Sequence, residues 1–129
     1  MDQDDLVADL RKVADDLEAE AGPLALFMVV ASNPDTNDGL NMIVSAPGFD
    51  AKSIGTAVRE LSDALRRNVR QSEWRRFLRV TPLRTGDPFV RAMNSRFHAE
   101  QSIINLDSVS VTGIDIPRAV VLESKRVAA

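Results

Sequence analysis

The feature that most constrains the fold of this chain is an uninterrupted apolar run of 8 residues, Leu24 to Ala31, which contains paired valines. β-Branched residues favour strands, and a strand that is apolar at every position has both faces covered. The run is too short to cross a bilayer as a helix, which takes about 20 residues. We therefore expect a central strand that is buried on both faces or lies at a subunit contact.

A helix is expected before this strand. Its apolar face carries Leu6, Leu10, Val13 and Leu17. Spacings of four, three and four residues place these side chains on one side of a helix. The opposite face is acidic and carries Asp5, Asp9, Asp15, Asp16 and Glu18. Gly22-Pro23 ends the helix, because glycine adopts the left-handed conformation and proline cannot continue the helix.

A hairpin and a second helix are expected after the apolar run. Residues 32–39 are dense in turn formers, and apolar residues then alternate from Leu40 to Val44 as they do in a strand. Asp50 is the expected N-cap of a helix that runs to about Arg70. The side chains that this helix would turn inward are Ile54, Val58, Leu61, Leu65 and Val69.

A third strand is expected after a polar connection over residues 71–75, which contains the only tryptophan, Trp74. The strand covers Phe77 to Leu83, with Leu78 and Val80 on its buried side. Proline cannot donate to a strand ladder, so Pro82 places this strand at an edge of the sheet or ends it.

A third helix and two further strands complete the chain. Asp87-Pro88 is a strong helix start, with the aspartate as N-cap and the proline at the first helical position. Its apolar side carries Phe89, Val90, Met93 and Phe97. The strands cover Ile103 to Thr112 and Ala119 to Ser124, joined by a corner over residues 113–117.

This order of elements, α-β-β-α-β-α-β-β, is neither a series of βαβ units nor an all-β meander. It predicts an α+β two-layer sandwich with a mixed sheet of about five strands and about three helices. A chain of 129 residues has room for one domain, which we place at residues 1–126, with a frayed C-terminus at 127–129.

The net charge of -3 hides two oppositely charged halves. Residues 1–50 carry 11 acidic and 2 basic side chains (-9), whereas residues 51–100 carry 5 acidic and 11 basic side chains (+6). Such asymmetry indicates an anion-binding face, or halves that attract each other within one chain or across an oligomer.

The arginine-rich segment 66–84 is the candidate anion-binding surface. Its proposed members are Arg70, Arg75, Arg76 and Arg79, with Trp74 stacking on a base. The competing interpretation is a solvated face with ion pairs, because Arg59, Asp63 and Arg67 follow at intervals of four. An isoelectric point near 5.1 and an aromatic content of 5% favour that second interpretation.

Catalytic signatures are weak. His98 is the only histidine, with Asp87, Glu100 or Asp107 as orienting carboxylates, and it equally suits the capping of a helix C-terminus. The sequence has no Gly-x-Ser-x-Gly elbow and no P-loop pattern. A calcium loop starting at Asp35 fails its register, since residues 40 and 46 are leucine and alanine. We expect no cofactor and no metal site.

The leading functional hypothesis is a non-enzymatic domain that works through protein contacts and forms a homo-oligomer, most simply a homodimer. The apolar strand and the complementary charged halves motivate it. The alternatives are an anion-binding module for nucleotide or nucleic acid, and a small hydrolase that uses His98. The lack of cysteine and the acidic start favour the cytoplasm over a secreted or membrane location.

Overall fold

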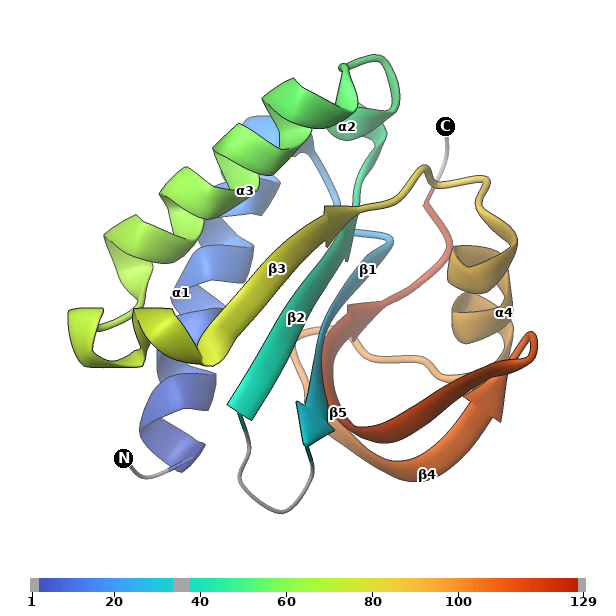
Figure 1. Ribbon diagram of the computed structural model, residues 1–129. Coiled ribbons are helices and arrows are strands. Elements are labelled where there is room, and N and C mark those ends of the chain that lie inside the picture. The colour runs from blue at the N-terminus through green and yellow to red at the C-terminus, as the bar shows by residue number, and fades with distance from the viewer. Residues whose placement is uncertain (1–2, 34–37, 128–129) are drawn as a thin grey trace.

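Five strands form one mixed sheet in the order β3-β2-β1-β5-β4, with helices on both of its faces (Figure 1). The computed structural model describes residues 3–33 and 38–127. The strands are β1 (Leu26–Asn33), β2 (Asp38–Ser45), β3 (Phe77–Pro82), β4 (Ile104–Val111) and β5 (Ile114–Ser124). The helices are α1 (Gln3–Ala21), α2 (Pro47–Asp50), α3 (Ile54–Asn68), the 3-10 helix η1 (Gln71–Arg76) and α4 (Pro88–Arg96).

The α+β class, the mixed sheet and the order of the main elements are as the sequence predicted. The pair β2–β3 is parallel, whereas β1–β2, β1–β5 and β4–β5 are antiparallel. The structure adds two short helical segments, α2 and η1, to the three helices that the periodicity indicated. The third strand lies at an edge of the sheet and ends at Pro82, as the proline implied.

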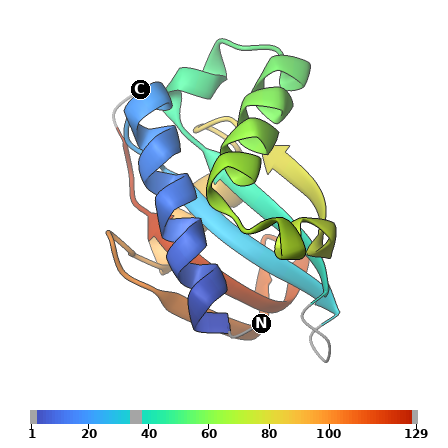
Figure 2. The same cartoon turned by 90° about the vertical axis from the view of Figure 1, so that its left-hand side faces the viewer.

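The central strand β1 is buried on both faces, and both covers come from its own chain. Phe27, Val29 and Ala31 point into a core beneath α1 and α3, which lie together on one face of the sheet (Figure 2). Leu26 and Met28 point to the other face, into a second core that includes residues of α4, β4 and β5. The apolar run therefore needs no subunit contact to bury it.

The end of α1 is fixed by two glycines. Gly22 has a φ of +85° and donates to the carbonyl of Glu18 at 3.0 Å, which is the expected helix-ending geometry. Gly48 in α2 lies against the helix end, where an added Cβ would come within 2.6 Å of the Ala21 carbonyl oxygen. Only a residue without a side chain fits between α2 and α1 at this position.

The predicted start of the second helix was wrong. Asp50 ends the short helix α2, and Ser53 is the N-cap of α3, where its hydroxyl accepts a hydrogen bond from the Thr56 amide. The carboxylate of Asp50 instead accepts hydrogen bonds from the amide and hydroxyl of Thr85 at 2.9 and 2.6 Å. The Asp50 carboxylate thus binds Thr85, on another segment, and does not cap α3. The helix also ends at Asn68, before the expected Arg70.

Two apolar side chains that the sequence assigned to the core are exposed instead. Ile54, the first residue of α3, is 75% exposed, and the first buried residue of this helix is Ala57. Leu78 is 73% exposed, and the pairing of β3 with β2 shifts beside it, since Leu40 pairs with Phe77 but Asn41 pairs with Arg79. This β-bulge breaks the alternation on which the prediction depended.

The C-terminal hairpin is tighter than expected. The turn consists of Thr112 and Gly113, both with positive φ, and β5 already begins at Ile114. The predicted corner over residues 113–117 is therefore mostly strand. Pro117 is tolerated because it falls between the pairs Val109–Ile116 and Asp107–Arg118, opposite Ser108, which also has a positive φ.

Candidate functional site

The two charged halves of the chain meet within one molecule, along the contact between α1 and α3. Arg67 donates two hydrogen bonds to Asp16, at 2.9 and 3.1 Å, and lies 3.4 Å from Glu20. The hydrogen bond to Asp16 raises the pKa of Arg67 above its ordinary value. Arg70 pairs with the buried carboxylate of Asp9 at 3.1 Å. The complementary charged halves, which were one reason to expect a homodimer, thus pair within a single chain.

The predicted anion-binding residues have different surroundings in the fold. Arg70 contacts Asp5 and Asp9 of α1, and Arg76 pairs with the buried Glu73 of its own short helix. Arg75 and Arg79 point elsewhere and line an open groove.

This groove, which we call the α3–β3 groove, lies between helix α3 and edge strand β3 and has a volume of about 590 Å³. Its apolar lining consists of Val58, Leu65, Trp74, Phe77, Leu78 and Val80. Three arginines, Arg66, Arg75 and Arg79, lie along it, and no aspartate or glutamate does. Their side chains make no hydrogen bond or ion pair with any residue that the structure describes. The groove therefore combines an apolar lining with a local charge of +3.

Trp74 lines the groove and is only partly exposed. Its indole N–H donates to the Val69 carbonyl at 2.7 Å, and its ring packs against the core beneath α1 and α3. The predicted polar connection is thus an ordered 3-10 helix that holds the ring in place. A ligand in the groove would contact the remaining part of the ring and would be reported by its fluorescence.

Comparisons with protein-family models, with curated proteins and with solved structures find no match for this chain.

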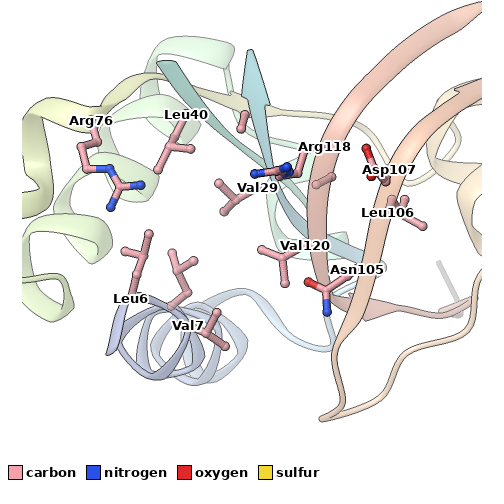
Figure 3. Close-up of a pocket in the computed structure, with 13 residues that line it drawn as sticks. Leu6, Val7, Val29, Leu40, Arg76, Asn105, Leu106, Asp107, Arg118 and Val120 are labelled. Carbon is pink, nitrogen blue, oxygen red and sulfur yellow. The ribbon is translucent and has the colours of Figure 1, made fainter. Parts of the chain in front are cut away.

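The structure contains a second candidate site that sequence reasoning missed. This site, which we call the α1–β5 cleft, has a volume of about 280 Å³ and lies between the first half of α1 and the sheet (Figure 3). Val29, Leu40 and Val120 line it from three strands, and Leu6 and Val7 line it from α1. These residues are far apart in the sequence, and no motif joins them.

Polar side chains lie around this aliphatic lining. Arg76 reaches the cleft from η1 and Arg118 from β5, and in Figure 3 both guanidinium groups lie across the space from Leu6 and Val7. Asn105 and Asp107 approach from β4. Asp107 is the cross-strand register partner of Arg118. One of the four predicted anion-binding arginines, Arg76, thus belongs to this cleft and not to the groove.

The geometry around His98 does not assemble a catalytic group. Its side chain is 71% exposed, and its Nε2 lies 3.8 Å from Glu100, beyond hydrogen-bond distance. Neither Asp87 nor Asp107 pairs with it: Asp87 caps α4 through the Phe89 amide, and Asp107 lies at the α1–β5 cleft. A His98-dependent hydrolase remains a prediction without geometric support.

Residues 3–33 and 38–127 contain neither a candidate metal site nor a candidate membrane-spanning helix. No cluster of three or more histidine, cysteine or acidic side chains that could hold a metal ion occurs in those ranges. None of the helices described there is long and apolar enough to cross a membrane. Of the loop 35–39 that superficially resembles a calcium site, residues 35–37 lie outside the described residues.

Proposed function

We propose that this chain is a protein-interaction module that binds an acidic, apolar-containing segment of a partner protein in the α3–β3 groove. The observation that supports the proposal most directly is the exposed Leu78, which lines the groove together with Arg66, Arg75 and Arg79. An apolar side chain with 73% exposure gains free energy when a partner covers it. Guanidinium groups without partners attract carboxylates and exclude basic segments.

The character of the lining favours a peptide over a nucleic acid. Val58, Leu78 and Val80 are aliphatic and fit leucine or valine side chains, whereas bases bind through stacking on aromatic faces. The N–H and part of the ring of Trp74 are already occupied within the fold. The whole chain is also acidic, with a net charge of -3, which opposes general attraction to phosphate backbones.

The shape of the groove favours an extended segment. Four consecutive residues of β3, Phe77 to Val80, line it, so it follows the outer edge of the strand and not one face alone. Among the described strands β3 pairs only with β2, and its other edge is open. A bound segment would place apolar side chains near Leu78 and carboxylates near the arginines.

The test is a titration followed by Trp74 fluorescence, which is specific because the chain has one tryptophan and no tyrosine. The probes are a short peptide of alternating glutamate and leucine, its lysine–leucine counterpart, its glutamate–serine counterpart, and a single-stranded oligothymidylate. We expect saturable binding of the glutamate–leucine peptide alone. Binding should weaken as the salt concentration rises, because the three arginines of the groove are exposed to solvent and salt screens their charges.

Variants assign the binding to the groove. Arg75→Glu/Arg79→Glu should weaken the glutamate–leucine peptide by about tenfold or more at low salt, and Leu78→Ser should weaken it without changing the salt dependence. Arg59→Glu is the matched control, since Arg59 is exposed on α3 but does not line the groove. Equal binding of both charged peptides, or equal loss in Arg59→Glu, would reject the proposal. Binding of the oligothymidylate that the double variant abolishes would favour the nucleic-acid alternative.

The homodimer predicted from the sequence is a separate question. Its two motivating observations, the apolar strand and the complementary halves, are explained inside one chain. It stays a prediction that light scattering at micromolar concentration tests. A monomer whose mass does not change with salt would contradict it.

A further inference from the structure

We infer that the α1–β5 cleft binds a small monocarboxylate with an aliphatic tail, at a site separate from the α3–β3 groove. The cleft holds about 280 Å³ of space, just below the usual range for ligand pockets, so its ligand is small. The inference does not depend on the proposed peptide binding, because only Arg76 among the predicted site residues contributes to it and the groove does not contain Arg76.

The aliphatic lining of the cleft is the reason to expect a ligand with an aliphatic tail. Val29, Ala31 and Leu40 form part of the surface on β1 and β2, and Leu6 and Leu10 face it from α1. All five side chains are at most 5% exposed, so they belong to the core although space remains beside them. Space beside a core deprives its lining of van der Waals contacts. An apolar tail in the cleft would restore those contacts and remove apolar surface from water.

The two arginines of the cleft are the reason to expect a carboxylate on the ligand. Arg76 and Arg118 come from different elements and lie on the same side of the cleft, across from α1 (Figure 3). A guanidinium carries five N–H donors in a planar fork, so an arginine that already pairs within the chain can also donate to a ligand. Arg76 is held by its pair with Glu73, and Arg118 lies opposite Asp107 in the register of β4 and β5.

The charge of the lining sets the charge of the ligand. Two arginines and one aspartate line the cleft, which gives a formal charge of +1 (two minus one). A single carboxylate matches this charge. A phosphate dianion would add a second negative charge beside Asp107, where like charges repel. Asn105 can additionally donate from its side-chain amide to a carboxylate oxygen.

The test compares octanoate, octan-1-ol and octylamine by calorimetric titration of the intact chain, with methyl NMR of Val29 and Val120 to locate the binding. We expect octanoate to bind saturably and to shift both valines. Octan-1-ol, which keeps the tail and lacks the charge, should bind about tenfold more weakly, and octylamine should not bind. No saturable octanoate binding, or equal binding of octan-1-ol, would overturn the inference.

Two variants and one control complete the test. Arg118→Gln should weaken octanoate about tenfold and leave octan-1-ol unchanged, because it removes the charge but not the space. Ala31→Ile should weaken both ligands by filling the cleft. Arg59→Gln, a change at an exposed arginine outside the cleft, should affect neither. Equal effects of Arg118→Gln and Arg59→Gln on octanoate, or shifts confined to the groove near Trp74, would overturn the inference even if Ala31→Ile fails to fold.

Discussion

Arg11 on α1 donates a hydrogen bond of 2.7 Å to Glu123 on β5, whose side chain is only 1% exposed. The same carboxylate accepts the amide of Gln101 at 2.8 Å, and Lys125 lies 3.5 Å from its other oxygen. This cluster joins the first helix, the last strand and the loop before β4. Its ion pairs connect α1, near the start of the chain, with β5 and Lys125, near the end.

The first prediction concerns that ion pair. Arg11→Met should lower the free energy of unfolding by about 3 kcal/mol, because it leaves a buried carboxylate without its main partner. Chemical denaturation measures the change, and Lys12→Met is the control because Lys12 is the exposed neighbour on the same helix. Equal stability of the two variants would show that Glu123 does not depend on Arg11.

The second prediction concerns alkaline pH. Burial alone lowers the pKa of Lys125, but the hydrogen bond to Glu100 and the charges of Glu123 and Glu100 raise it overall above 10.5. The folded chain thus holds this proton more tightly than the unfolded chain. The stabilisation is complete below about pH 10.5 and disappears as the pH rises through the higher folded pKa.

Denaturation midpoints measured across the alkaline range test this dependence, and the lack of tyrosine removes one competing titration. Lys125→Met should flatten the loss of stability, whereas Lys12→Met should leave it as in the parent chain. An unchanged alkaline profile in Lys125→Met would contradict the assignment.

The third prediction compares two glycines. Gly48→Ala should destabilise the fold by roughly 1–3 kcal/mol, because the new Cβ would lie 2.6 Å from the Ala21 carbonyl oxygen and 2.7 Å from its Cα. Gly55→Ala, in the first turn of α3, meets nothing within 4 Å and should stabilise the fold by about 0.5 kcal/mol. Thermal unfolding of both variants measures the contrast, and a similar Tm shift in both would refute the close approach of α2 to α1.

The fourth prediction distinguishes the cap of α3 from the residue that the sequence suggested. Ser53→Ala should cost about 1 kcal/mol and speed amide exchange in the first turn of α3. Asp50→Ala should instead speed exchange at Thr85, because it removes two hydrogen bonds to that residue. Faster exchange at Thr56 in Asp50→Ala than in Ser53→Ala would reverse this assignment.

Local signals in the sequence were sufficient for several elements. The Asp87-Pro88 start of α4, the glycine end of α1 and the doubly buried β1 are all present as expected. Each depends on interactions within a few residues, or on a composition that only one environment satisfies. The same local reasoning failed where a distant group intervened, as Thr85 did for Asp50 and the pairing shift beside Leu78 did for β3.

Reasoning from near neighbours in the sequence was less successful still for the candidate sites. The sequence located the arginine-rich segment, but not which arginines would pair within the chain, because Asp9 and Asp16 lie more than 50 residues from Arg70 and Arg67. Nothing in the sequence indicated the α1–β5 cleft, because its lining residues come from α1, β1, β2, η1, β4 and β5.

Periodicity and turn chemistry, acting over a few residues, determined that this chain forms an α+β domain around a buried central strand. Tertiary structure decided which charges neutralise each other, which apolar side chains remain exposed and where space remains between α1 and the sheet. The physical reason is range: helix, strand and cap preferences are set by near neighbours, whereas ion pairs, bulges and clefts arise from groups that only folding brings together.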